Sequence, residues 1–307
     1  MKSPWISLFS ASLSLTLTGC CCGLVDLSDF LPSGEEAEPS ADTPGVELGV
    51  AVYPDKTPEA QATRYAWRNG NKEPSVYRVG YALSKDEQAA VDRAQSDLVE
   101  AVNFRDRGGG KFSWTPPKGC GPHMQCIFED LAKHSKPDID PLVALFRAQI
   151  KKENLDTTES VELVMTFVQA IPYEIPEGRP FGLLPPALVA AQKKGDCDSK
   201  ALLLHMLLEA LGVDSVLLTS EAHLHSMLAV AVPAQGTKIT YEGRDYAFVE
   251  TTAKGAPLGW ISKKMLTPND WIVVPVKVRM LEKPTKHDVA EGKAEPDDKP
   301  RKKPRRQ

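Results

Sequence analysis

Residues 195–200, Gly-Asp-Cys-Asp-Ser-Lys, stand between a polar segment and a long apolar run. Residues 201–211 are Ala, Leu, Met and Glu with a single His, a composition that favours a helix. Asp196 is a suitable N-cap, so we expect this helix to begin at position 196 or 197 and to end at Leu211. Cys197 then lies in the first turn, where unpaired N–H groups and the helix dipole favour a thiolate. The stretch therefore predicts a nucleophilic cysteine at the start of a buried helix.

A nucleophilic cysteine needs a base, and the base needs a group that orients it. His225 heads an apolar run, residues 226–232, which predicts a buried strand. A second predicted strand, residues 246–249, ends at Glu250. The pattern thus supplies a candidate base, His225, and a candidate orienting carboxylate, Glu250, downstream of Cys197.

Each of these residues has a plainer interpretation. A lone cysteine is most often a small buried hydrophobic residue, and Glu250 alone is an ordinary carboxylate at a strand end. His223 is an alternative base, because two residues apart in one strand it shares a face with His225. His205 lies on the apolar helix with no partner nearby in sequence, which predicts a core histidine.

Taken together, Gly195-Asp196-Cys197, the helix ending before Gly212, His225-Ser226-Met227 and Glu250-Thr251-Thr252 resemble a bacterial transglutaminase-like domain of the papain-like cysteine-enzyme superfamily. The resemblance covers residues 140–276. It implies an α+β fold with a papain-like, transglutaminase-like core, in which the nucleophile helix packs on an antiparallel sheet. The glutamate in the third position departs from the commoner aspartate.

The resemblance also implies an activity, which is acyl transfer from peptide or protein amides. Cys197 would attack the amide carbonyl, His225 would move the proton, and Glu250 would orient the imidazole. Water as acceptor gives peptidase or amidase chemistry and an amine gives cross-linking. The mechanism needs no metal or organic cofactor. A catalytically inactive binding module on the same fold, or a passive envelope spacer, is the alternative.

Upstream of the cysteine, residues 140–152 and 158–170 carry apolar side chains at helical spacing, which predicts two amphipathic helices. The second helix stops near Pro172. Gln169 near its end resembles the segment that lines the oxyanion side in this superfamily, where its amide would donate to a developing oxyanion. The alternative is a surface glutamine at a helix end.

The N-terminal region, residues 46–127, is predicted to be α+β, with strands at 46–53 and 75–83. Ser84 and Glu87 form a capping-box pattern for a helix that runs to about residue 102. This region is either a small domain or an elaboration on the catalytic domain.

Cys120 and Cys126, within a Gly/Pro-rich turn, are expected to form a disulfide if the chain is exported. A metal site made with His123 is the alternative, although a fourth ligand is not apparent nearby.

The N-terminal end of the chain suggests export. Residues 1–19 combine Lys2 with a short apolar run, as in a signal peptide, and resemble a lipoprotein signal that would make Cys20 the lipidated N-terminus. Plain secretion is the alternative. Residues 20–45 are predicted to be a disordered tether and residues 283–307 a charged disordered tail. We therefore expect a cell-envelope protein anchored to a membrane by its N-terminal lipid.

The chain has 307 residues, which allows one or two domains, and a formal net charge of -4. This balance provides no basic excess that would indicate a nucleic-acid partner. The expected partners are a peptide or protein substrate and the membrane.

Overall fold

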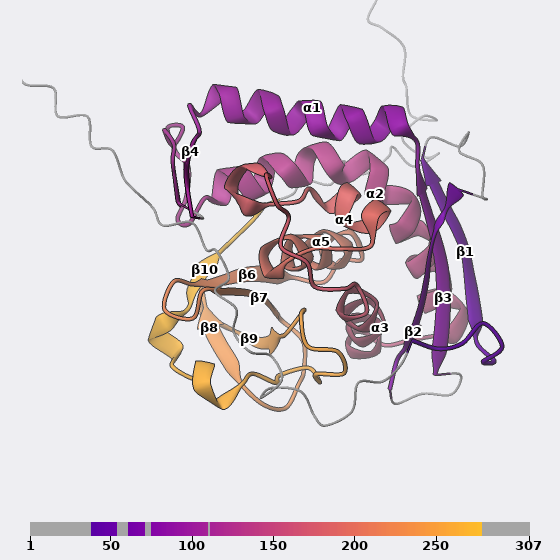
Figure 1. Ribbon diagram of the computed structural model, residues 1–307. Helices are drawn as coiled ribbons and strands as arrows, with labels where there is room; N and C mark the ends of the chain where they lie inside the picture. The colour runs from indigo at the N-terminus through magenta and orange to yellow at the C-terminus, as the bar shows by residue number, and fades with distance from the viewer. Residues whose placement is uncertain (1–37, 54–60, 71–74, 110, 278–307) are drawn as a thin grey trace, which may run out of the picture.

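The structure is a computed structural model that describes residues 38–53, 61–70, 75–109 and 111–277 (Figure 1). Within these ranges the protein is α+β, as the sequence predicted. The predicted signal peptide, most of the tether with Cys20, and the charged tail lie outside the described residues.

The central element is helix α5 (Cys197–Ala210), which is buried on all sides from its first residue to Leu208. Helices α2 (Gln125–Glu153), α3 (Thr157–Gln169) and α4 (Pro186–Gln192) pack around it (Figure 1). The predicted start and N-cap are confirmed, and Leu211 is the C-cap. Burial of a helix over its whole circumference requires a second layer on its remaining side, which a sheet provides.

That layer is a five-stranded antiparallel sheet in the order β10-β6-β7-β9-β8. Its strands are β6 (Ser215–Ser220), β7 (His225–Val230), β8 (Lys238–Tyr241), β9 (Arg244–Val249) and β10 (Ile272–Val274). One face of the sheet packs on the helices, while the other face buries a smaller cluster with Ile261, Trp271 and Met265, the last of these in the short 3-10 turn η4 (Lys263–Met265). A second such turn, η5 (Pro268–Asp270), comes just before Trp271. Because β7 and β9 are antiparallel neighbours, the start of β7 and the end of β9 lie side by side at the same end of the sheet's strands.

The N-terminal region forms a three-stranded sheet in the order β1-β3-β2, from β1 (Val46–Tyr53), β2 (Thr63–Arg68) and β3 (Val76–Leu83). Helix α1 (Lys85–Ala101) follows, with Ser84 accepting a hydrogen bond from Glu87 N. A small hairpin follows, made of β4 (Arg105–Gly108) and β5 (Lys111–Ser113).

This N-terminal sheet shares one hydrophobic core with the α5 region. The Trp67 ring lies 5.3 Å from that of Phe167 on α3 and 6.1 Å from that of Phe146 on α2. The Tyr65 hydroxyl donates to the carbonyl of Ala190 on α4 at 2.5 Å. The geometry therefore matches an elaboration packed on the α5 region.

Helix α2 differs from the sequence prediction. We expected a helix over residues 140–152, but α2 begins at Gln125 and passes through Pro137 and Pro141. A proline inside a helix removes a hydrogen bond, which normally favours a break. Here the helix continues because its apolar face is buried along most of its length, through Ile127, Phe128, Leu131, Ile139, Leu142, Val143 and Phe146.

The described end of the predicted tether packs on the N-terminal sheet. Arg78 on β3 donates to the carbonyls of Ser40, at 3.0 Å, and Thr43, at 2.6 Å. Among the helices in the described ranges, none is both long and apolar enough to cross a membrane.

Candidate active site

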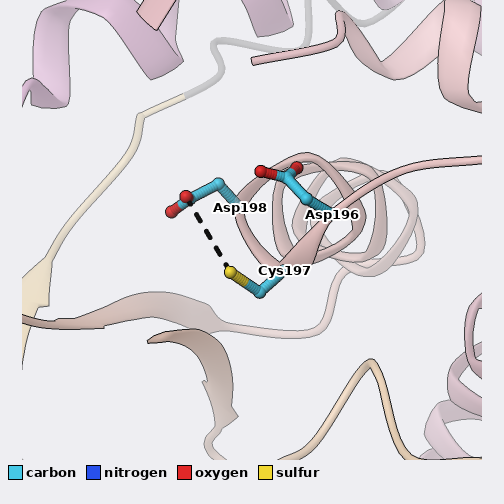
Figure 2. Close-up of side chains that lie close together, drawn as sticks. All are labelled: Asp196, Cys197 and Asp198. Carbon is cyan, nitrogen blue, oxygen red and sulfur yellow. Dashed lines mark hydrogen bonds between the residues drawn. The ribbon is translucent and has the colours of Figure 1, made fainter. Parts of the chain in front are cut away.

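Cys197 is the first residue of α5. The Asp196 carboxylate accepts a hydrogen bond from Ser199 N at 3.0 Å and so caps the helix. The Ser199 hydroxyl in turn accepts from Leu184 N at 2.9 Å, which fixes the first turn against the preceding loop. Cys197 is fully buried. Figure 2 shows its sulfur facing the carboxylate of Asp198, with Sγ 3.9 Å from Oδ2.

His225 and Glu250 lie close together at the end of the sheet where β7 begins and β9 ends. His225 Nε2 lies 2.9 Å from Glu250 Oε2, and both side chains are buried. A carboxylate only accepts hydrogen bonds, so Nε2 carries the proton in this pair. In a neutral ring Nδ1 is then the basic nitrogen, and proton exchange with a neighbour falls to it.

Glu250 is held in its ionised form. Its second oxygen, Oε1, accepts from Thr252 N at 2.7 Å and from Thr252 Oγ1 at 2.6 Å. Burial opposes ionisation, but the charge of His225 and the hydrogen bonds from His225 and Thr252 outweigh it, lowering the pKa of Glu250 to about 2. The carboxylate is thus a fixed negative charge beside the imidazole.

Gln169 acts on the backbone that carries Glu250. Its Nε2 donates to the carbonyl of Glu250 at 2.9 Å and to that of Ala256 at 3.0 Å. Both amide hydrogens are engaged within the protein, so this conformation does not favour the expected donation to an oxyanion. The side chain is 2% exposed, which also argues against a surface glutamine. Gln169 instead fixes the loop after β9.

A hydrogen bond joins the residue that follows Cys197 to the residue that follows His225. The Ser226 hydroxyl donates to Asp198 Oδ1, and both side chains are buried. Asp198 directly follows Cys197, and Ser226 directly follows His225. The start of α5 is therefore attached to the start of β7 at the residues adjacent to both candidates.

Lys200, on the first turn of α5, is an unusual buried lysine. It has no exposed surface, and its Nζ donates to the carbonyl of Ile171 at 2.6 Å. Burial lowers the pKa of Lys200 to about 7, against the opposite effect of the Glu250 charge. The charge of Lys254 also lowers it, while those of Cys197 and Asp196 raise it.

The other two histidines considered above have different surroundings. His223 lies in the turn before β7 and pairs with Asp270, with Nε2 and Oδ2 3.3 Å apart, rather than with Glu250. The Trp271 ring lies 5.7 Å from the ring of His223 and 6.4 Å from that of His225. His205 is fully buried between the Ser215 hydroxyl, 2.8 Å from Nδ1, and the Val276 carbonyl, 2.9 Å from Nε2.

Two groupings of ligand-type residues have simpler structural explanations. Cys120 and Cys126 form a disulfide, so neither can be a thiolate ligand in the alternative metal site with His123. Ligand-type atoms of Asp196, Cys197 and Asp198 lie within 4.8 Å of one another. The carboxylates of this second grouping already serve the helix cap and the bond to Ser226.

Four residues of this site were missed in the sequence: Asp198, Lys200, Ser226 and Thr252. The sequence carried a signal for Lys200, because it is a lysine inside a helix with no polar face. For Asp198 and Ser226 the signal was weak, since their bond joins positions 28 residues apart.

Comparisons of the chain with protein-family models, curated proteins and solved structures found no match.

Proposed function

We propose that this protein is a thiol enzyme that transfers acyl groups from peptide or protein amides, on a papain-like, transglutaminase-like core. The observation that carries the proposal is the buried 2.9 Å pair of His225 and Glu250, beside the helix that begins with Cys197. Glu250 selects the tautomer of His225 in which Nδ1 accepts a proton.

In the proposed reaction, the Cys197 thiol gives its proton to His225 Nδ1 and the sulfur attacks the amide carbonyl. The Cys197 backbone N–H stabilises the oxyanion of the tetrahedral intermediate. His225 then protonates the departing amine as the C–N bond breaks, leaving a thioester. Water or a second amine attacks the thioester and gives its proton to His225, which returns a proton to the sulfur as it leaves. Water as acceptor gives hydrolysis and an amine gives cross-linking.

The complete burial of Cys197 favours a second candidate, a catalytically inactive envelope binding module on the same fold. In this conformation the sulfur is covered, so an enzyme must move the covering groups before substrate reaches it. The buried pair of His225 and Glu250 favours the enzyme, because an inactive module has no need of an ionised glutamate in the interior.

Capture of the acyl-enzyme distinguishes the two candidates. The full chain is incubated with a peptide library and Cys197 is examined for a thioester by mass spectrometry, with Cys197→Ala as control. The enzyme predicts a peptide-derived mass on Cys197 that the control lacks. Peptide binding without any adduct in the wild type would support the binding module.

We also propose that the chain is exported and anchored through a lipid on Cys20. The support is the N-terminal sequence pattern alone. Metabolic labelling with a fatty acid tests it, because Cys20→Ala should lose the label. Equal labelling of the two proteins would contradict the anchor.

A further inference from the structure

We propose that Asp198 and Lys200, two buried charged residues on the first turn of α5, set the proton affinity of the Cys197 thiol in opposite directions. Asp198 holds the resting thiol protonated, and Lys200 stabilises the thiolate that forms from it. Both are positioning residues for the thiol. The inference concerns the site of the proposed enzyme, but it can be tested without any acyl transfer.

Asp198 faces the sulfur directly. Its Oδ2 is 3.9 Å from Sγ, in the arrangement of a thiol that donates to a carboxylate (Figure 2). Its Oδ1 is committed to Ser226, so the carboxylate cannot turn away without breaking a buried hydrogen bond. A negative charge held this close to the sulfur disfavours a second negative charge on it.

Lys200 supplies the opposite charge three residues further along the helix, where side chains share a face with the residue at i−3. Its ammonium is held in place by the Ile171 carbonyl, and its stem packs against the loop before the helix, with Cγ 3.4 Å from the position that a Gly195 Cβ would take. Burial lowers the pKa of Lys200 to about 7, but the negative charges of Glu250 and Cys197 favour its ammonium form, so a thiolate at Cys197 and a cation at Lys200 stabilise each other. A charge held in the interior is screened less than one at the surface. Lys200 therefore favours the thiolate.

Other charged groups act on the same turn, and they belong to three elements. Asp196 is the N-cap of the helix, and Glu250 and Lys254 come from the loop after β9. His225 is the first residue of β7. His225 and Glu250 are paired with each other. Because neither substitution removes any of these other groups, the change in thiol behaviour reports on the residue that was replaced.

The measurement is the rate at which iodoacetamide alkylates Cys197 as a function of pH, followed by mass spectrometry of the peptide that contains it. Because only this peptide is followed, alkylation of the other cysteines of the full chain does not contribute to the measured rate. We expect Lys200→Met to raise the pH midpoint by about one unit or more, and Asp198→Asn to lower it by a similar amount. Loss of structure alone would move both midpoints the same way.

Lys194→Met is the matched control. Lys194 lies three residues before Cys197, as Lys200 lies three residues after it, but its side chain is 36% exposed and pairs with Glu174 at 2.6 Å. Solvent screens this charge, so the midpoint should not move. If Lys200→Met does not fold, Lys200→Gln retains a donor for the Ile171 carbonyl, and Asp198→Asn is measured independently.

Midpoints that stay within a few tenths of a unit in both variants, or that move in the same direction, would overturn the inference. The outcome is separate from that of the proposed function. Opposite shifts in a protein that forms no acyl-enzyme would retain the inference and reject the enzyme. An acyl-enzyme with unmoved midpoints would do the reverse.

Discussion

The first turn of α5 and the turn that carries His205 are equally buried, yet their polar groups are satisfied in different ways. His205 lies between a hydroxyl and a backbone carbonyl, both neutral. His225, beside the first turn, is paired with an ionised carboxylate. Burial lowers the pKa of His205 to about 4, against the effect of its bond to Val276, so this ring is neutral at physiological pH.

The difference shows that a buried histidine is not by itself a sign of chemistry. Neutral partners keep His205 uncharged and fixed, and its protonation would cost stability. An anionic partner lets His225 take up a proton in the interior, because the imidazolium then has a counter-charge. The charge of the partner separates a structural histidine from a candidate base.

Replacement of His225 is the strongest test of the difference between His205 and His225. His225→Ala should lower turnover by roughly 10⁶-fold, the scale on which a serine protease responds to loss of its histidine. His223→Ala should have a mild effect, because His223 pairs with Asp270 rather than with Glu250. Turnover is measured on an amide substrate identified by acyl-enzyme capture, with folding checked by thermal melting. The reverse order of severity would make His223 the base.

The role of the anionic partner is tested next by Glu250→Gln, which keeps the size of the side chain and removes its charge. Turnover should fall by roughly 10⁴-fold, as for the comparable aspartate-to-asparagine change in a serine protease. Glu250→Asp should keep part of the activity, because the charge survives with a shorter reach. Parent-rate turnover in a normally folded Glu250→Gln would leave a Cys–His pair as the site.

The sequence predicted the parts of this arrangement that depend on local signals. Helix α5 was predicted because its residues favour a helix and Asp196 caps it. The start of β7 and the end of β9 were predicted from apolar runs. The apolar spacing predicted a helix from residue 140 only, whereas α2 begins at Gln125, because the packing that carries the helix through Pro137 and Pro141 is not a local signal.

Strand β2 and the partners of the buried charges were missed for different reasons. Strand β2 alternates between buried Tyr65 and Trp67 and more exposed neighbours, so its signal was present but short. Lys200 was visible as a lysine in an apolar helix, but its acceptor at Ile171 is 29 residues away. Pairings of that kind depend on the assembled fold.

His205 gives the third test, through stability rather than activity. His205→Leu should lower the free energy of unfolding by about 1–3 kcal/mol at pH 7, because the Ser215 hydroxyl and the Val276 carbonyl lose their partner. Activity per folded molecule should not change. Chemical denaturation measures the first quantity, and His134→Gln, at a more exposed position on α2, is the control that should show little loss.

Acid titration of the wild type extends this test. The pKa of His205 falls from 6.5 to about 4 on folding, so the unfolded chain binds more protons in this window. The stability that neutral His205 contributes is therefore full above pH 6.5 and is lost as the pH falls toward 4. The difference between the wild type and His205→Leu should shrink over that range. Glu250, whose pKa falls from 4.5 to about 2, contributes stability that is lost only below pH 4.5.

The smallest effect is expected at Gly195, which precedes the helix cap. A Cβ at this position would lie 3.4 Å from side-chain atoms of Lys200, Ser199 and Val189, which is ordinary van der Waals contact. The backbone here is not in the left-handed region that favours glycine, so alanine introduces no backbone strain. Gly195→Ala should therefore change the free energy of unfolding by no more than about 0.5 kcal/mol.

Turnover in Gly195→Ala should likewise stay within a few-fold of the parent, and steady-state kinetics with chemical denaturation measure both quantities. The chemistry of the first turn would then depend on Cys197 and its charged neighbours rather than on the glycine before them. A large loss of turnover with unchanged stability would show that substrate passes over Gly195 and needs the space that its missing side chain leaves.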